Sequence, residues 1–480
     1  MRGPKPQRMP KPQRIRCPVH NLIEFGTDQF EQTLWRAIQT PPFQRLRRIR
    51  QLGFSELVFP GATHTRFAHS LGVFHMARKL IEVIRRSIGA DRTRMYGHHQ
   101  AQVALAAALL HDIGHGMFSH AFEPLAKRLR LPSAEHERAS ATLIRDSEIA
   151  DVLNAELGSG FANDVAALIE RKEPGNLYDA VVSSQFDADR LDYMQRDRLM
   201  TGVQSSGVDP VWLLANLEVA AVRTGADDAS AGEIETLVLG PKAVQTAQSY
   251  VLALFHLYPN VYLHKATRGA EQVFAALMER LLRLAADGHT AKTGLEERHP
   301  LIRFAKEPGD SARAQALDDH VFWGALPMLE EAEDAEIARL AGALRGRRLF
   351  RCIDVRAQIA VALPPRKDEA REKHQARIAL ACTRAERLLR MAPKCILTDS
   401  YSRSPYKRVQ ESQSPLNRIL IRTTAGSPPQ DMAELSPIIA AAEPFHILRA
   451  YVARDDDKAG RTIENIVRTS TRGGEEDGQA

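Results

Sequence analysis

Residues 109 to 116 read Leu-Leu-His-Asp-Ile-Gly-His-Gly, an apolar run that ends in an adjacent histidine and aspartate. The residues before this stretch, from 100 onward, are so apolar and alanine-rich that they predict a helix buried on nearly all sides. That helix carries His111 and Asp112 into the interior, where an ionised carboxylate is costly unless it is paired or binds a metal. The stretch therefore predicts half of a metal site, whose other ligands must come from elsewhere in the chain.

A helix expected from residue 66 to about residue 86 offers one of those ligands. It places Arg66 and His69 on one face, because residues three apart lie on the same side of a helix. An arginine beside a histidine suits a metal ligand next to a phosphate contact. Taken alone, His69 fits a packing histidine better, so its assignment depends on the other ligands.

A charged segment near residue 190 offers another ligand. Asp189, Tyr193 and Asp197 recur every four residues and stack on one helix face, with Arg190 beside it. A carboxylate, a phenol and a second carboxylate in a row suit a metal followed by a sugar. The competing interpretation is a solvated charged helix, but the apolar residues within the segment indicate that it also packs.

Three further histidines lie at the end of the central stretch or shortly after it. They are His115, His120 and His136, and Glu123 lies between them in the sequence. Imidazoles and carboxylates at this density are not a packing pattern. We count all four as candidate catalytic residues, because imidazoles and carboxylates are the side chains that most often transfer protons in catalysis.

Assembled from three helices, the expected metal ligands are His69, His111, Asp112 and Asp189. Two imidazoles and two carboxylates suit a divalent ion such as Mg, Mn, Fe, Ni or Zn, which keeps open positions for water and substrate. Such a site activates water, and the neighbouring arginines offer positive charge for phosphates. The residues by themselves therefore predict metal-dependent phosphoester hydrolysis.

The composition, 44% hydrophobic and 26% charged over 480 residues, is that of a globular protein long enough for two lobes. Residues 1 to 16 hold six basic and no acidic residues, which predicts a solvated tail or, alternatively, a nucleic-acid-binding arm. The four cysteines form no Cys-x-x-Cys pair, which argues against a zinc ribbon or a secreted disulfide scaffold. No window reaches the roughly 18 apolar residues of a membrane span. We expect a cytoplasmic protein without a membrane partner.

The order H, HD, D resembles the signature of the HD superfamily of metal-dependent phosphohydrolases. Five segments resemble its dNTP triphosphohydrolase branch and, within it, the sterile-alpha-motif/HD-domain enzymes, which cleave a dNTP to a deoxynucleoside and inorganic triphosphate. They are QRLRRIRQLG from residue 44, VFPGATHTRFAHSLGV from 58, HDIGHGMFSHAFE from 111, EHE from 135 and DADRLDYMQRD from 187. Weaker likeness continues into the second half of the chain. No sterile-alpha-motif domain is expected.

The resemblance carries the family's functional residues onto this sequence. The metal ligands fall on His69, His111, Asp112 and Asp189. The catalytic histidines fall on His115, His120 and His136, of which His120 would be the general acid. The phosphate contacts fall on Arg66 and Arg190. The sugar contacts fall on Gln51, Tyr193, Asp197 and Tyr262, although the residue after this last tyrosine is leucine where the family often has glutamine. Leu52 would lie at the sugar edge, where a 2′-hydroxyl is excluded.

Two departures from the family pattern concern regulation. The family's nucleotide-activator loop reads Asp-Pro-x-His-Gly, whereas residues 17 to 21 here read Cys-Pro-Val-His-Asn. An acidic residue that recognises guanine is replaced by Gln39. The resemblance thus implies intact catalysis, while the departures count against a GTP-type nucleotide activator. It also implies a homo-oligomer, a dimer, tetramer or hexamer, in which subunit contacts form or order the sites.

The expected fold is mainly α, with a helical HD-domain core and a smaller C-terminal α+β lobe. The expected parts are a disordered basic tail (1–14), the HD phosphohydrolase domain (15–290), the C-terminal lobe (291–465) and a disordered tail (466–480). Extended pieces are expected at residues 56–61, 349–353, 358–363, 394–397, 418–422 and 446–452, because these runs are short and apolar. Residues 205–245 are read as polar and mixed, with a loop at 225–232.

Two other functions stay open beside dNTP hydrolysis. An HD phosphohydrolase or phosphodiesterase could act on another nucleotide, since the spacing of Tyr193 and Asp197 favours a deoxynucleoside sugar without proving it. A nucleic-acid-binding HD protein could instead use the basic tail and its arginines to hold single-stranded nucleic acid.

Overall fold

The computed structural model describes residues 11–89, 95–131, 134–205, 207–223, 232–406, 414–424 and 426–472. The chain forms two compact units, each assembled from separate segments. Unit 1 comprises Met1–Tyr258, Pro308–His320 and Tyr406–Ala442, and unit 2 comprises Pro259–Glu307, Val321–Pro405 and Glu443–Ala480. The expectation divides the chain once, near residue 290, whereas the units interleave along it.

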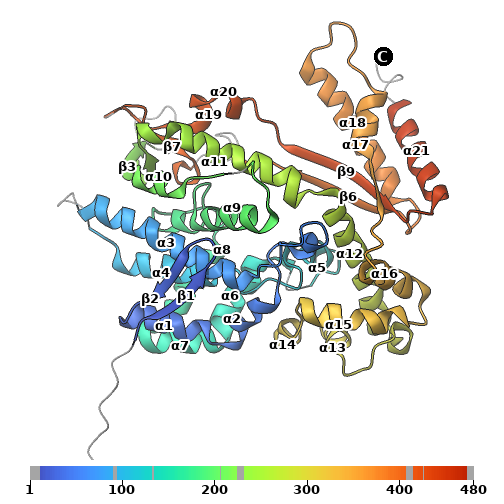
Figure 1. Ribbon diagram of the computed structural model, residues 1–480, viewed down its shortest axis with the longest axis horizontal. Helices are drawn as coiled ribbons and strands as arrows, with labels where there is room; N and C mark the ends of the chain where they lie inside the picture. The colour runs from blue at the N-terminus through green and yellow to red at the C-terminus, as the bar shows by residue number, and fades with distance from the viewer. Residues whose placement is uncertain are drawn as a thin grey trace, which may run out of the picture. The chain divides into compact units, whose positions relative to one another are not determined.

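Unit 1 is built mainly of helices (Figure 1). It begins with an antiparallel hairpin and two helices, β1 (Gln13–Cys17), β2 (Asn21–Phe25), α1 (Gln29–Ile38) and α2 (Pro41–Arg45). The longer helices follow as α3 (Arg66–Gly89), α4 (His98–Leu110), α5 (Glu123–Arg128), α6 (His136–Asp146), α7 (Glu148–Leu157), α8 (Phe161–Glu170), α9 (Ala188–Thr201), α10 (Pro210–Ala215) and α11 (Val244–Leu257). Later segments add α14 (Ser311–Gln315), α19 (Met432–Leu435) and α20 (Pro437–Ala440).

A four-stranded sheet completes unit 1, in the order β3-β4-β7-β8. Its strands are β3 (Leu217–Arg223), β4 (Glu233–Leu239), β7 (Leu420–Ile421) and β8 (Gln430–Asp431). The pairing of β3 with β4 is antiparallel, whereas β4 and β7 run parallel. The sequence interpretation missed the β3–β4 hairpin in its polar region, and the loop expected at 225–232 falls almost wholly outside the described residues.

The core of unit 1 forms where α3 packs against both α4 and α9. Every residue of α4 from Val103 to Leu110 is buried, because its small alanines let neighbours approach on all sides. Helix α9 begins at a defined point, since the side chain of Asp187 accepts a hydrogen bond from the Arg190 backbone N–H at 2.8 Å. The expectations for these three helices are confirmed to within a few residues.

Two short segments differ from expectation for local reasons. Residues 53–57 form the 3₁₀ turn η2 (Gly53–Leu57), which takes in the start of the piece expected to be extended. Gly53 has a φ of +50°, and a Cβ there would lie 2.9 Å from the Phe118 carbonyl oxygen, so the close approach needs glycine. Residues 358–362 lie in a helix instead of a strand, because Asp354 caps that helix by accepting a hydrogen bond from the Ala357 N–H at 2.9 Å.

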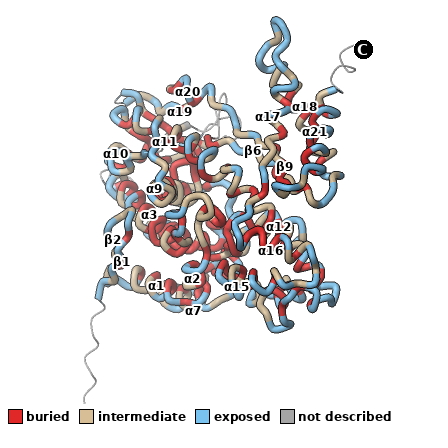
Figure 2. Tube along the Cα trace, turned by 45° about the vertical axis from the view of Figure 1, so that its right-hand side comes forward, coloured by how far each residue is buried: buried red, intermediate tan, exposed pale blue. Residues whose placement is uncertain are grey.

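Unit 2 combines helices with a small antiparallel sheet ordered β5-β9-β6. Its strands are β5 (Arg351–Asp354), β6 (Leu397–Arg403) and β9 (Phe445–Val452), and its helices are α12 (Lys265–Ala286), α13 (Pro300–Lys306), α16 (Ala335–Arg345), α17 (Val355–Ala362), α18 (Arg371–Arg390) and α21 (Asp457–Arg472). Buried apolar residues of β9, α17, α18 and α21 form one core. Figure 2 shows buried residues, in red, on each of these elements. Helix α15 (Asp319–Glu330) begins in unit 1 and continues in unit 2.

The mainly α fold class is confirmed. Regular structure reaches into both segments expected as tails, since β1 begins at Gln13 and α21 ends at Arg472. The rest of those tails, residues 1–10 and 473–480, lies outside the described residues. Among the helices of the described ranges, none is long and apolar enough to cross a membrane.

Candidate active site

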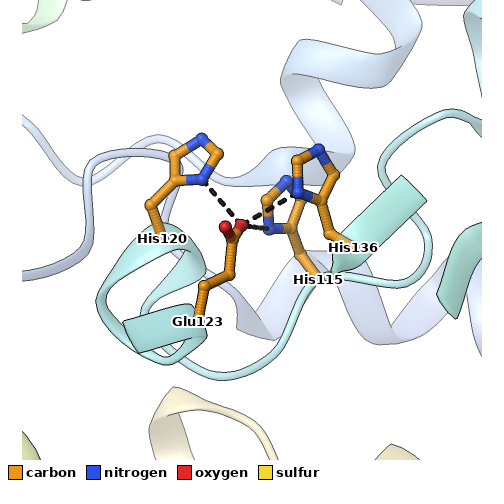
Figure 3. A group of neighbouring side chains, drawn as sticks. All are labelled: His115, His120, Glu123 and His136. Carbon is orange, nitrogen blue, oxygen red and sulfur yellow. Dashed lines mark hydrogen bonds and ion pairs between the residues drawn. The ribbon is translucent and has the colours of Figure 1, made fainter. Parts of the chain in front are cut away.

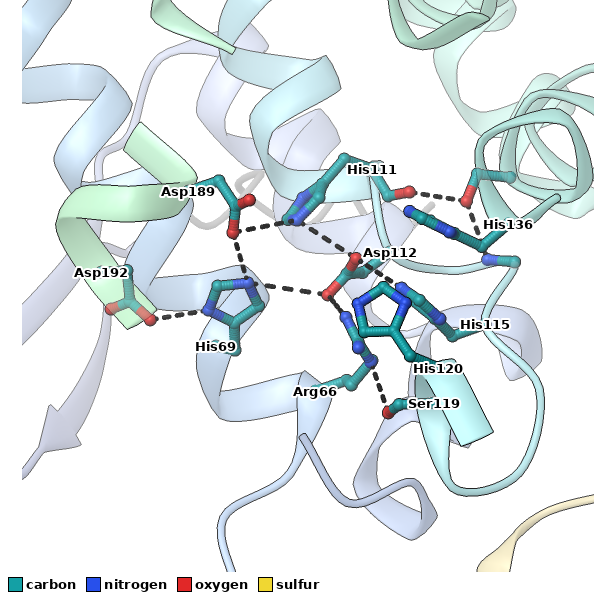
Figure 4. A network of polar contacts seen from close by, with 12 residues as sticks. Arg66, His69, His111, Asp112, His115, Ser119, His120, His136, Asp189 and Asp192 are labelled. Atoms are coloured by element: carbon teal, nitrogen blue, oxygen red, sulfur yellow. Dashed lines mark hydrogen bonds and ion pairs between the residues drawn. The ribbon is translucent and has the colours of Figure 1, made fainter. Parts of the chain in front are cut away.

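Three elements of unit 1 bring the expected metal ligands together (Figure 4). His69 lies in the first turn of α3, His111 and Asp112 follow α4 directly, and Asp189 lies in the first turn of α9. Nε2 of His69 lies 3.0 Å from Oδ1 of Asp189 and 3.6 Å from Oδ2 of Asp112. Nε2 of His111 lies 3.2 Å from Oδ1 of Asp112. The four side chains therefore face one another from three helix ends.

These donor atoms fit a divalent ion. Nε2 of His69 lies 3.0 Å from Oδ1 of Asp189 and 3.6 Å from Oδ2 of Asp112, so an imidazole nitrogen and two carboxylate oxygens converge on one point. Donor atoms gathered in this way can share a divalent ion. His69, His111 and Asp189 each offer one donor atom, and these three atoms lie within 4.8 Å of one another. The Asp112 carboxylate lies beside the imidazoles of His69 and His111. Two imidazoles and two carboxylates would hold an ion such as Mn, Fe or Zn and leave positions for water.

Each histidine ligand is oriented through its other ring nitrogen. Nδ1 of His111 lies 3.0 Å from the Ala108 carbonyl oxygen, and Nδ1 of His69 lies 2.8 Å from Oδ2 of Asp192. Contacts of this kind fix the tautomer that leaves Nε2 for a metal. Burial alone would lower the pKa of His69, but hydrogen bonds with Asp189 and Asp192 raise it to about 10, so a proton competes with the ion.

Arg66 contacts a metal ligand directly. Its Nη1 donates to Oδ2 of Asp112, and its Nε donates to Oγ of Ser119 at 2.7 Å. Burial alone would raise the pKa of the Asp112 carboxyl, but the guanidinium and the imidazoles of His111 and His115 hold that pKa well below its usual range. The residue expected to contact a phosphate therefore also keeps Asp112 ionised.

A second group of side chains converges on one carboxylate oxygen (Figure 3). Nδ1 of His120 lies 2.8 Å from Oε1 of Glu123, and Nδ1 of His136 lies 2.9 Å from the same oxygen. Nδ1 of His115 lies 3.8 Å from it. Burial alone would lower the pKa of His136, but the Glu123 carboxylate raises it. The carboxylate thus favours the protonated form of this imidazole.

The ring geometry of this group disfavours a second shared ion. The rings of His115 and His136 are stacked, with centroids 4.0 Å apart and planes 15° from parallel. A metal lies about 2 Å from an imidazole nitrogen, in the plane of the ring, so two nearly parallel rings cannot both direct a lone pair at one ion. The arrangement favours proton transfer and phosphate contact. Burial and the charge of Arg66 hold the pKa of His115 well below its usual range, so that ring is neutral.

Comparison with known proteins places the chain in a family. The HD domain family model matches residues 66–194, and the HD associated region matches residues 232–297. The protein YwfO of Bacillus subtilis is 30% identical over 337 residues, which cover 70% of this chain and 71% of YwfO. The chain belongs to the HD phosphohydrolase family. Its HD domain match spans all four expected metal ligands and the second histidine group.

Other relatives of this HD protein match a shorter part of the chain and have names that state an activity. The deoxynucleoside triphosphate triphosphohydrolase SAMHD1 of Bos taurus is 33% identical over 222 residues, which cover 40% of this chain and 36% of that protein. The SAMHD1 homologue of Dictyostelium discoideum is 35% identical over 190 residues, covering 38% and 36%. A solved phosphohydrolase from Bacteroides thetaiotaomicron matches with a TM-score of 0.67 and 25% identity, covering 92% of this chain and all of that chain.

The loop that follows α4 and carries His115 and His120, here called the histidine loop, is held by a segment far along the chain. Asp319 accepts hydrogen bonds from the Phe118 N–H at 2.6 Å and the Arg50 N–H at 2.7 Å. Arg45 is buried and donates to the carbonyl oxygen of His115 at 2.8 Å. Sequence reasoning missed these positioning residues, because the contact with Phe118 joins residues 201 positions apart and nothing in the local pattern indicates it.

Three of the residues expected to contact a sugar, Gln51, Tyr193 and Asp197, belong to unit 1. Tyr193 and Asp197 follow Asp189 along α9, and burial raises the pKa of Tyr193, so its hydroxyl stays protonated. Asp197 contacts Nε2 of His64 at 2.8 Å, a pairing that sequence reasoning missed. The side-chain oxygen of Gln51 is buried and has no hydrogen-bond partner among the described residues.

Three further residues are expected to contact the substrate, and they lie in different parts of the chain. Leu52 is half-buried at the start of η2, and Arg190 lies on α9 with its Nε 3.8 Å from Oδ2 of Asp187. Tyr262 ends the π-helical turn η7 (Tyr258–Tyr262) and belongs to unit 2, whereas the other expected site residues belong to unit 1.

Proposed function

We propose that the chain hydrolyses deoxynucleoside triphosphates to a deoxynucleoside and inorganic triphosphate, with a divalent metal at the four ligands described above. The observation that carries this proposal is the order of groups on α9. Asp189 belongs to the metal cluster, the name used here for the four expected ligands of one ion, His69, His111, Asp112 and Asp189. Tyr193 and Asp197 continue the same face of α9, one and two turns farther along. A metal for the phosphates, followed by a phenol and a carboxylate for a sugar, matches the parts of a deoxynucleotide. The names of the SAMHD1 relatives support the same substrate class.

The chain's own residues then have distinct tasks. A bound ion supplies positive charge for phosphate oxygens and activates water. Asp192 and the Ala108 carbonyl hold the two imidazole ligands in place. His120 is the residue best placed to protonate the leaving oxygen, because its side chain is 67% exposed while Glu123 holds its Nδ1.

The decisive experiment is product analysis by chromatography. The purified chain is incubated with Mn²⁺ or Mg²⁺ and each dNTP, alone and in pairs. We expect a deoxynucleoside and intact triphosphate, and release of single phosphates from all four dNTPs would contradict the proposal in favour of another HD phosphohydrolase activity. The paired incubations also report whether a nucleotide activator is needed. Assembly into a homo-oligomer stays a prediction.

Glu123→Gln should shift the alkaline limb of the rate profile to lower pH. The carboxylate raises the pKa of His136, so its removal lowers that pKa and the imidazolium is lost at a lower pH. A protonated His136 beside the general acid His120 would supply positive charge for the phosphates, so activity should fall at a lower pH in the variant as that charge is lost. The measurement is kcat against pH from 5 to 10 for both proteins. An unchanged limb would show that the charge of His136 plays no part in the reaction.

Removal of metal should lower the melting temperature of the wild-type chain. An ion that binds only the folded state stabilises it, by about 2.7 kcal/mol at 100 times its Kd. We expect EDTA to lower the melting temperature and Mn²⁺ to restore it, as followed by circular dichroism. The same additions should leave Asp189→Ala unchanged, and an equal Mn²⁺ response in that variant would place the ion elsewhere.

A further inference from the structure

Residues 17–21, which include the turn between β1 and β2, are linked to the metal cluster through the carboxylate of Asp192. Nε2 of His20 lies 2.6 Å from Oδ1 of Asp192, and Oδ2 of the same carboxylate lies 2.8 Å from Nδ1 of His69. One carboxylate thus joins an imidazole of the turn to an imidazole of the metal cluster. The turn is the segment that departs from the family's activator loop, and neither catalysis nor substrate contact accounts for its histidine.

The joining carboxylate is fully buried and held from a third side. Arg196, one helical turn farther along α9, donates to both oxygens of Asp192 from Nε and Nη2, each at 2.8 Å. The side chain of His20 is only 4% exposed, and that of Asp192 is 0% exposed. The turn contributes a second contact, because Nη2 of Arg196 lies 3.5 Å from the sulfur of Cys17. Water cannot replace a lost partner easily at such depth, so each donor restrains the carboxylate.

We infer that His20 is a positioning residue for the metal ligand His69 and acts through Asp192. The inference rests on the metal site of the proposed function. With three donors, the carboxylate has one orientation in which Oδ2 faces the ligand imidazole. Without the His20 contact on Oδ1, only Arg196 and His69 hold the carboxylate, which can then tilt against the guanidinium, and the ring of His69 loses its alignment. The turn is therefore coupled to the metal through two consecutive hydrogen bonds.

Metal affinity tests this inference without any substrate. Mn²⁺ binding to the full chain is measured by competition with a chelator, and the absorption spectrum of bound Co²⁺ reports ligand geometry. Loss of a partner that orients a metal ligand typically weakens metal binding about 10- to 100-fold. We expect His20→Ala to weaken Mn²⁺ binding by about 10-fold and to alter the Co²⁺ spectrum, while His20→Gln, which keeps a donor, retains most of the affinity.

A matched control is available on the surface. Nε2 of His99 lies 2.8 Å from Oδ2 of Asp164, and both side chains are more than half exposed. His99→Ala therefore removes a histidine–aspartate pair of similar length far from the cluster, and its Mn²⁺ affinity should equal that of the wild type. If His20→Ala does not fold, His20→Leu fills the same buried space without a donor and should show the same loss.

The double variant separates positioning from general packing. If His20 acts through Asp192, then His20→Ala should cost little further affinity in an Asp192→Asn background, because coupled residues are not additive. Wild-type Mn²⁺ affinity in folded His20→Ala or His20→Leu would overturn the inference, as would a full additional loss in the double variant. Because no substrate is present, a chain that leaves dNTPs intact would refute the proposed function without affecting this result.

Discussion

Asp189→Ala should abolish hydrolysis and, when unfolding is compared in EDTA without metal, leave the free energy of unfolding nearly unchanged. The carboxylate is one of four expected metal ligands, and its side chain is 37% exposed at the first turn of α9. Loss of a ligand removes charge stabilisation worth several kcal/mol in a reaction of this type, so we expect a rate at least about 1000-fold lower. Product release and bound metal are measured on the same sample, and unfolding is followed in urea.

Asp112→Asn should abolish hydrolysis too, but at a clear cost in stability. Asp112 pairs with Arg66 where both side chains are only 3% exposed. Removing one charge of a buried pair leaves the other uncompensated, which typically costs about 3–5 kcal/mol. The two variants therefore differ in urea midpoint although both are inactive. Retention of more than a few per cent of the wild-type rate by either one would argue against its role as a ligand.

Gly72→Ala should destabilise the chain, although alanine is the better helix former by about 1 kcal/mol in an ordinary helix. A Cβ at this position of α3 would lie 1.9 Å from Oδ1 of Asp192 and 2.5 Å from Nη2 of Arg196. The buried pair would have to move, and overpacking of this kind costs about 1–3 kcal/mol before any loss of hydrogen bonds. We therefore expect a loss of at least about 2 kcal/mol in urea unfolding, together with weaker metal binding, because Asp192 also holds His69.

The control for this prediction lies in the same helix. Gly89 ends α3, and a Cβ added there meets no atom within 4 Å among the described residues. Gly89→Ala should therefore be neutral or slightly stabilising. If both variants had the same stability, the close approach of Asp192 and Arg196 to α3 would not restrict this position.

The sequence predicted the parts of the molecule in which chemistry and periodicity agree. The apolar run before His111 and the four-residue spacing from Asp189 identified two of the ligand helices, because each pattern is local. Asp192 escaped notice since a carboxylate one turn from a ligand looks like another surface charge until its burial is known. Asp319 escaped because its partners are far away in the chain. Residues 358–363 look like a strand by composition, yet all but the last of them lie in a helix that Asp354 caps.

The position of Asp319 has a practical consequence for dissecting the protein. A fragment cut after Tyr258 would keep His69, His111, Asp112 and Asp189, and a family search would find its HD domain intact. It would nevertheless lack the acceptor that anchors the backbone of the histidine loop, since the segment Pro308–His320 returns to unit 1 from later in the chain. A fragment that keeps this anchor must therefore extend at least to Asp319, or have the later segment grafted back or supplied as a separate peptide.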